Sequence, residues 1–212
     1  YLAICKLIVE HITANKNPAD IYWGYTPLHY AAKNGNLAIC KLIMEHIDGD
    51  KNPGDELGST PFHFAAKHGH LEICQLIMGR INDTNPLAMD ETTPLHLAAE
   101  NGHLEICKLI LEKIDGNKNP GDVFGNTPLH EAAKNGHFDV CVLILPLVHV
   151  DDKNPKDGEG MTPLHCAASG LHSNICRLIT NEIEDKNPVN DDGETPKKLW
   201  KDASRNLVRE LW

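Results

Sequence analysis

The chain has 212 residues, with 30 acidic and 20 basic side chains and a formal net charge of −10. Non-specific binding to DNA or RNA depends on clustered lysine and arginine side chains, so this charge argues against a nucleic-acid-binding protein. No apolar stretch approaches the roughly 20 residues that a membrane-spanning helix needs, so we expect no membrane insertion.

The first predicted element is a helix within residues 1–16. Its sequence YLAICKLIV nearly repeats the later segment NLAICKLIM, residues 36–44. That later segment is the second half of a recurring unit. We therefore expect residues 1–16 to be a truncated N-terminal repeat of a longer parent chain.

Five similar segments follow, each beginning with Thr-Pro; the first is TPLHYAAKNGNLAICKLI, residues 26–43. The Thr-Pro pairs start at Thr26, Thr60, Thr93, Thr127, Thr162 and Thr195, spaced 33 to 35 residues apart. A fixed period of this length predicts a stack of units in which each contacts only its neighbours. We predict one solenoid over 1–212, with five full repeats in about 17–186 and a C-terminal capping repeat in 187–212.

Each unit contains two predicted helices. Thr is a good N-cap and Pro is tolerated at the first helical position, so Thr-Pro begins the first helix and a Gly ends it. The second helix, such as HLEICKLILEKI in residues 103–114, is apolar on more than one face and must be covered on several sides. A polar return with Asn-Pro and Gly follows. Such short helices are not stable alone, which predicts an all-α repeat solenoid.

The period, the T-P-L-H-x-A-A segment and the G-H-L-E-I run resemble the ankyrin repeat over essentially the whole chain. The resemblance implies a stack of antiparallel helix pairs joined by β-hairpin-like loops. It also implies a non-enzymatic module that binds a protein or peptide on the concave surface, which hairpin tips and first helices form. The alternative is a regulatory or targeting arm of a larger enzyme, channel or ligase adaptor.

Some residues depart from the family pattern. The exit after the second helix reads D-K-N-P instead of the usual Gly-Ala-Asp-Val-Asn-like segment. Glu91 replaces a hairpin glycine, which predicts a differently shaped third loop. Leu171 replaces the glycine after a first helix, with Gly170 one residue early. Pro146 lies inside a predicted second helix and should end or kink it. We expect the least regular stacking in repeats four and five.

The histidines and cysteines recur with the repeat. We interpret the histidine of T-P-x-H as a structural residue that bonds Thr and nearby backbone. This series is His29, His63, His96, His130 and His165, and a second series before the second helix is His70, His103, His137 and His172. The cysteines on the packing face are Cys5, Cys40, Cys74, Cys107, Cys141 and Cys176. Because zinc needs converging ligands, we expect no metal and no cofactor.

No catalytic motif occurs, so we expect no enzyme activity from this segment. Cys166 is the one cysteine outside the series, and we interpret it as a variable surface position rather than as a nucleophile. The pattern of single cysteines indicates a reducing, intracellular compartment, cytoplasmic with a nuclear one not excluded. The asparagine before each Pro resembles one that is hydroxylated in some ankyrin-repeat proteins, and Asn119 is the nearest match.

Differences between repeats mark the candidate binding surface. Only 5% of the chain is aromatic, yet the first repeat carries four aromatic residues around its hairpin tip and first helix. Tyr and Trp are enriched at interface hot spots. The alternative is that these rings pack on an upstream repeat. The candidate partner-binding residues are Tyr22, Trp23, Tyr25, Tyr30, Lys33, Asn34, Leu57, Phe64, Met89, Asp90, Glu100, Phe124 and Glu131. They predict a monomer whose partner has an apolar segment and basic residues.

Overall fold

The computed structural model describes residues 2–11, 16–47, 49–148 and 153–210. Within these ranges the regular elements are helices, and no β-strand is present. The elements are α1 (Leu2–His11), α2 (Pro27–Lys33), α3 (Leu37–His46), α4 (Pro61–Lys67), α5 (Leu71–Met78), α6 (Pro94–Glu100), α7 (Leu104–Leu111), α8 (Pro128–Lys134), α9 (Phe138–Ile144), a 3-10 turn (Leu145–Leu147), α10 (Pro163–Ser169), α11 (Ser173–Glu182) and α12 (Pro196–Glu210). The all-α prediction is confirmed. None of these helices is both long and apolar enough to cross a membrane.

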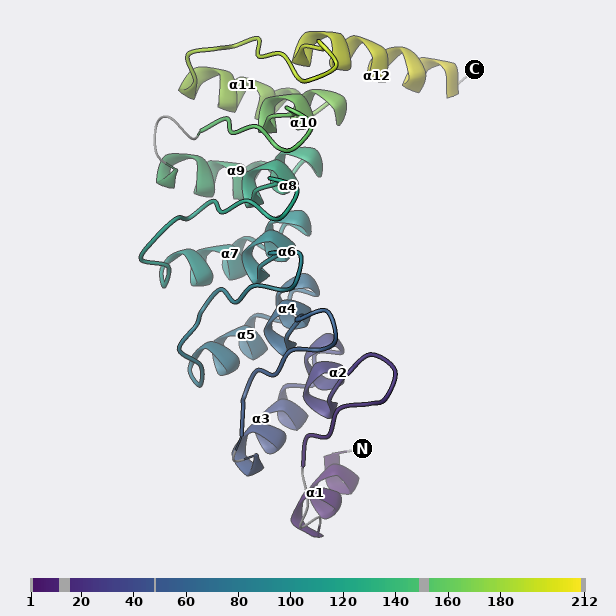
Figure 1. The fold of residues 1–212 in the computed structure, drawn as a ribbon, viewed down its shortest axis with the longest axis vertical. Coiled ribbons are helices and arrows are strands. Elements are labelled where there is room, and N and C mark those ends of the chain that lie inside the picture. Colours follow the sequence, from purple (N-terminus) through teal and green to yellow (C-terminus); the bar gives the residue numbers. More distant parts are fainter. Residues whose placement is uncertain (1, 12–15, 48, 149–152, 211–212) are drawn as a thin grey trace. The chain divides into compact units, whose positions relative to one another are not determined.

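The helices form two compact units, Tyr1–Ala98 and Ala99–Trp212, called unit 1 and unit 2 (Figure 1). In unit 1, α2 packs on α3 and α4, α4 packs on α5, and α3 packs on α1 and α5. In unit 2, α8 packs on α9 and α10, α10 packs on α11 and α12, and α9 packs on α7 and α11. Within each unit, neighbouring helix pairs are thus in contact, as a repeat stack requires. That both units belong to one solenoid stays a prediction, and residues 1, 12–15 and 211–212 of its end repeats lie outside the described ranges.

Helices α2, α4, α6, α8 and α10 each begin with a capping box that includes the histidine of T-P-x-H. Thr127 N–H donates to Nδ1 of His130 at 3.2 Å, and His130 N–H donates to Thr127 Oγ1 at 3.4 Å. The Nε2 of His130 donates to the carbonyl of Met161 in the next repeat at 3.2 Å. Because one ring nitrogen accepts and the other donates, the ring is neutral. The two bonds of the ring, from the Thr N–H to Nδ1 and from Nε2 to a carbonyl of the next repeat, recur at His29, His63 and His165. The structural interpretation of these histidines is therefore confirmed.

The D-K-N-P segment connects two helices through hydrogen bonds. Lys51 Nζ donates to the carbonyls of Met44 and Ile47, at the end of α3. The next residue, Asn52, accepts a hydrogen bond from Phe62 N–H, in the first turn of α4, at 3.0 Å. Asn17, Asn85, Asn119 and Asn154 make the equivalent bond. The segment therefore satisfies helix-end groups on both sides of the loop, which accounts for the unusual exit sequence.

The second histidine series joins helices α5, α9 and α11 to the preceding repeat. His137 precedes α9, and its Nε2 donates to the carbonyl of Glu100 at 2.8 Å. Its ring lies over Gly102, where a Cβ would come within 2.5 Å of Nδ1. Gly102 also has a φ of 72°, so both the backbone conformation and the close histidine ring favour glycine at this position. The pairs of His70 with Lys33 and of His172 with Lys134 are equivalent.

Two of the expected irregularities are absent. Glu91 has a φ of 60°, close to the 74° of its counterpart Gly58, and it closes the same turn. Leu171 also has a φ of 60°, and its N–H makes the turn bond of the glycine it replaces. Both expectations were wrong. Glu91 and Leu171 each adopt the left-handed backbone conformation of the glycine they replace, so the loop keeps its shape. The effect of Pro146 is confirmed: α9 ends at Ile144 and a 3-10 turn follows.

Candidate functional site

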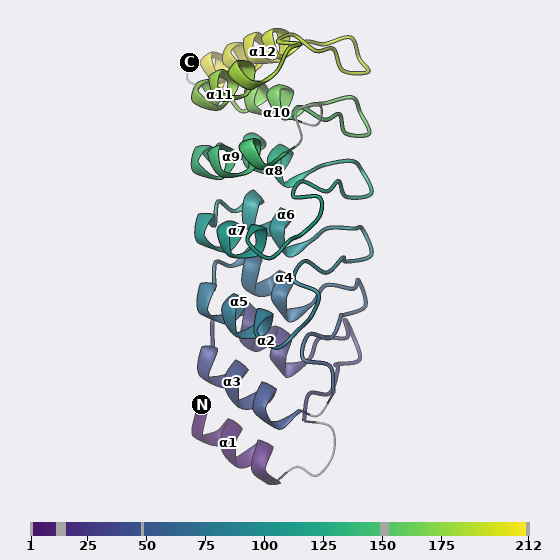
Figure 2. The same cartoon turned by 90° about the vertical axis from the view of Figure 1, so that its left-hand side faces the viewer.

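The loops before the first helices form fingers that project away from the second helices in each unit (Figure 2). Fingers one to six are residues 20–25, 55–59, 88–92, 122–126, 157–161 and 190–194. In finger two, Asp55 N–H donates to the Ser59 carbonyl at 2.9 Å. Asp55 Oδ1 accepts the N–H groups of Leu57 and Ser59 at 2.9 and 2.8 Å. Asp122 and Asp157 close their fingers in the same way, so the turns of fingers two, four and five are each built on an aspartate.

Backbone hydrogen bonds hold neighbouring fingertips together. In unit 1, Glu56 N–H donates to the Trp23 carbonyl at 3.0 Å, and Met89 N–H donates to the Leu57 carbonyl at 2.9 Å. In unit 2, Gly158 N–H donates to the Phe124 carbonyl at 2.7 Å. The tips of fingers one, two and three therefore form one column with fixed spacing, and so do the tips of fingers four and five.

Finger one and the adjoining helix α2 present three aromatic side chains at the surface. Asp20 Oδ1 accepts the N–H groups of Tyr22 and Trp23 at 3.0 and 2.8 Å, and Oδ2 accepts the phenol of Tyr30 at 3.1 Å. The bond from Trp23 is the main cause that lowers the pKa of Asp20. Tyr22, Trp23 and Tyr30 are 75%, 60% and 48% exposed. One carboxylate thus organises an exposed aromatic group.

Tyr25, the fourth aromatic residue of this repeat, has a different environment. It is half-buried and stacks on His29, with ring centroids 5.7 Å apart. It also meets Tyr30 and Phe64 edge to face, at 5.6 and 5.2 Å. These are the geometries that aromatic pairs favour. Tyr25 therefore connects finger one to α4 rather than standing free.

The apolar surface of unit 1 continues along its fingers. Leu57 at the tip of finger two is 61% exposed, and Met89 at the tip of finger three is 72% exposed. Beside them lies a hollow of about 280 Å³ whose lining includes Tyr25, Phe64 and Asp90. We call the exposed residues Tyr22, Trp23, Tyr30, Leu57 and Met89 the apolar strip. The structure thus brings the unit 1 candidates of the fingers together.

The remaining candidates lie beside these groups or in unit 2. Lys33 ends α2, and Asn34 caps it by donating to the Tyr30 carbonyl at 2.7 Å; both are exposed. In unit 2, Phe124 is 67% exposed at the tip of finger four. Glu131 is half-buried on α8, where burial raises its pKa, with Glu100 adding to that rise.

Cys166 is not a surface residue, contrary to the sequence interpretation. It lies in α10 and is only 7% exposed. Burial raises the pKa of its thiol to about 12, and the nearby Asp157 and Glu131 contribute to that rise. A thiol that stays protonated at neutral pH is a poor nucleophile. Within the described ranges, no group of three or more His, Cys, Asp or Glu residues is arranged to hold a metal ion.

Sequence reasoning missed the turn aspartates. Asp20, Asp55, Asp122 and Asp157 occupy the same position in their repeats, and this recurrence is the sequence feature that could have identified them. Their role could not be assigned without the fingers, since an aspartate in a loop has many other uses.

Comparisons with known families identify the repeat. A model of three consecutive ankyrin repeats matches residues 1–86 and 76–154, and a model of a single ankyrin repeat matches residues 159–191. These matches extend over most of the chain. A comparison with curated proteins gave no match.

Proposed function

Because the chain belongs to the ankyrin-repeat family, whose repeats are in general protein–protein interaction modules, we propose that it is a non-enzymatic module for a protein or peptide partner. The partner binds the face formed by fingers and first helices, which is the concave face in the family. The observation that carries the proposal is the exposed apolar strip of unit 1. The free cysteines, five of them buried, favour an intracellular, reducing compartment.

The strip has the properties of a binding surface. Contiguous apolar surface is uncommon on monomers unless it serves an interaction. Tyr and Trp, which dominate interface hot spots, make up three of its five residues. Hydrogen bonds between fingertips and to Asp20 already fix the backbone beneath these side chains. A partner therefore orders little on binding, and less of the interaction free energy is lost.

The charges beside the strip indicate the rest of the partner. Asp20, Asp55 and Asp90 belong to the same three fingers, and Glu56 and Glu91 are exposed next to the tips of fingers two and three. Carboxylates around an apolar surface favour a partner whose apolar segment is flanked by basic residues, and they speed its association. Lys33 and Asn34 offer polar contacts at the end of α2.

The test is affinity capture from a cell lysate with mass spectrometry, followed by calorimetry with the purified partner. Trp23→Ala should weaken binding by about 2 kcal/mol or more, the range of a hot spot. Folding should stay near wild type, because the Trp23 side chain is exposed. Phe138→Ala, at an exposed aromatic residue on a second helix, is the control and should bind normally.

Two results would contradict the proposal. If Trp23→Ala unfolds the first repeats and leaves affinity intact, the rings serve packing and the partner binds elsewhere. If Phe138→Ala weakens binding as much as Trp23→Ala does, the partner does not use the finger face.

A further inference from the structure

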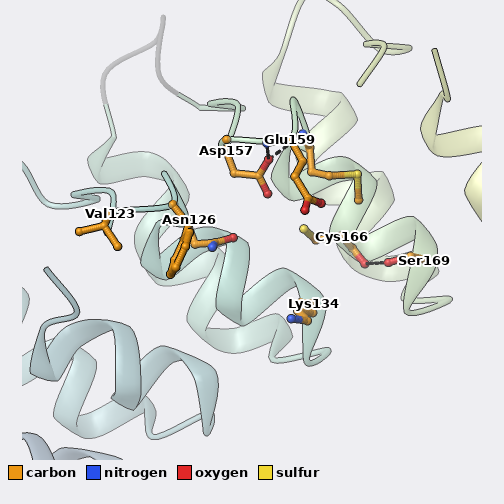
Figure 3. A pocket seen from close by; sticks show the side chains of 10 residues that line it. Val123, Asn126, Lys134, Asp157, Glu159, Cys166 and Ser169 are labelled. Atoms are coloured by element: carbon orange, nitrogen blue, oxygen red, sulfur yellow. Dashed lines mark hydrogen bonds between the residues drawn. The ribbon is translucent and has the colours of Figure 1, made fainter. Parts of the chain in front are cut away.

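Unit 2 contains a hollow of about 480 Å³ between fingers four and five and helices α8 and α10 (Figure 3). Figure 3 shows Val123 and Asn126 on finger four, Asp157 and Glu159 on finger five, and Lys134 on α8. Its volume is within the range of pockets that bind small ligands. None of these residues belongs to the apolar strip of unit 1, so the hollow is a separate candidate site.

Part of the lining is apolar. Phe124 and Val123 on finger four are 67% and 52% exposed. Met161 and the buried Cys166 also line the hollow. A thioether and a protonated thiol both behave as apolar, polarisable groups. The lining therefore suits a flat or extended apolar group that contacts the Phe124 ring.

The hollow also carries an excess of negative charge. Asp157 Oδ1 is fixed by the N–H groups of Glu159 and Met161, each at 2.9 Å. These bonds leave Oδ2 available to a ligand. The carboxylate of Glu159 is exposed beside it on the same finger. Lys134 is the one cation in the lining.

We infer that this hollow binds an arginine side chain of the partner. The inference rests on the proposed function, because the arginine belongs to the protein or peptide that the module binds. The three methylene groups of arginine can lie along Phe124 and Met161. Its planar guanidinium stacks on an aromatic ring and forms paired hydrogen bonds with carboxylates, here Asp157 and Glu159.

Other side chains fit less well. Lysine supplies the charge, but its ammonium is a strongly hydrated point charge that does not stack on the ring as a guanidinium does. An apolar side chain would displace water from Asp157 and Glu159 without pairing them, which is unfavourable. An acidic side chain would meet two carboxylates and a single lysine.

The experiment is an amide NMR titration of the full chain with three small probes. Nα-acetyl-arginine amide should give saturable shifts at Asn126, Glu159 and Met161. Nα-acetyl-citrulline amide, which has nearly the same shape without the charge, should not. Nα-acetyl-lysine amide should bind more weakly than the arginine probe.

Two variants sharpen the test. Glu159→Gln should weaken the arginine probe about tenfold, the factor expected for losing one hydrogen bond to a charged group. Glu112→Gln removes an exposed carboxylate at the end of α7 and should bind like wild type. Phe124→Ala should also weaken binding, since it removes the stacking surface. Unchanged thermal midpoints show that the variants fold.

The inference is overturned if the arginine probe gives no saturable shifts, or if its shifts lie away from the hollow. Equal binding of the citrulline or lysine probe also overturns it, as does unchanged affinity of Glu159→Gln. These outcomes leave the proposed function standing wherever partner binding still depends on Trp23. If partner binding is independent of Trp23 while the arginine probe binds, the proposed strip fails and the hollow stands.

Discussion

Tyr30 donates its phenolic hydrogen to Oδ2 of Asp20 across 3.1 Å, from a helix to the finger beside it. The other oxygen of this carboxylate holds the backbone N–H groups of Tyr22 and Trp23. A single acidic residue thus fixes both the turn of finger one and an aromatic side chain outside it. The exposed rings are therefore presented in a defined arrangement.

Replacing Asp20 with Ala should loosen finger one without unfolding the unit. The N–H groups of Tyr22 and Trp23 lose their acceptor, so their amide hydrogen exchange should become faster. Tyr30→Phe removes only the bond to Oδ2 and should leave these two amides nearly unchanged. Exchange measured by NMR distinguishes the variants. Equal protection in wild type and Asp20→Ala would show that the carboxylate does not hold the turn.

The capping-box histidines should make stability fall in mild acid. Burial lowers the pKa of His29, His63, His130 and His165 in the folded protein below the ordinary value. The unfolded state therefore binds more protons as pH drops below about 6.5. Their stabilising effect is complete above that pH and is lost on the way down to each folded pKa. Each group contributes a slope of up to about 1.4 kcal/mol per pH unit.

Urea unfolding at pH 7.5 and 5.5 measures this loss, and His130→Gln isolates one group. Glutamine can accept from the N-cap N–H as a capping box requires, but it does not titrate. The variant should lose about 1 kcal/mol at pH 7.5, because the bond to Met161 is removed. Its stability should then vary less steeply with pH than that of wild type. An identical slope would mean that His130 does not titrate on unfolding.

The parts of the fold that could be predicted depend on contacts within one repeat. The T-P-x-H box joins residues three apart, so its structural role was readable from the period. The end of α9 before Pro146 was also a local property. The role of Asn52 was not predictable in the same way, because its partner Phe62 is ten residues away across a loop. A pattern shows that an asparagine recurs but not which N–H it meets.

The sequence predicted the candidate site only for residues whose exposure depends on their own position in a repeat. Exposure of Trp23 and Met89 followed from their places at fingertips. The hollow of unit 2 needs Phe124 and Glu159, which are brought together by a backbone bond between two fingers. Such features depend on how neighbouring fingers pack, which single positions in a sequence do not reveal.

Replacing Asn52 with Ala should cost about 1 kcal/mol of unfolding free energy, as for other lost N-terminal helix caps. The Phe62 N–H loses its acceptor at a position where the buried helix start excludes water. Asn82→Ala is the control, because this exposed asparagine lies in the next exit loop. Denaturant unfolding of the two variants provides the comparison. Equal stabilities would argue that the Asn-Pro pair acts only through proline.

Thiol labelling should separate the cysteines by burial. Burial raises the pKa of Cys40, Cys74, Cys107 and Cys141 to about 12, so these thiols stay protonated and covered at pH 8. Half-buried Cys5 and Cys176 should react first with an aromatic disulfide reagent. Mass spectrometry of peptides identifies the labelled positions. Early modification of Cys74 would contradict the packing of the second helices.

Glu91 offers a stabilising substitution. It holds a left-handed backbone, with a φ of 60°, that costs a residue with a side chain about 1–2 kcal/mol. Glycine removes this cost but gains freedom in the unfolded chain, which offsets about 0.4–1 kcal/mol. Glu91→Gly should therefore raise the unfolding free energy by about 0.5–1 kcal/mol. The reverse change at the matching position, Gly58→Ala, should destabilise, because the added Cβ would lie 3.1 Å from the Met89 nitrogen. If Glu91→Gly is instead destabilising, the Glu91 side chain contributes more to finger three than its exposed position indicates.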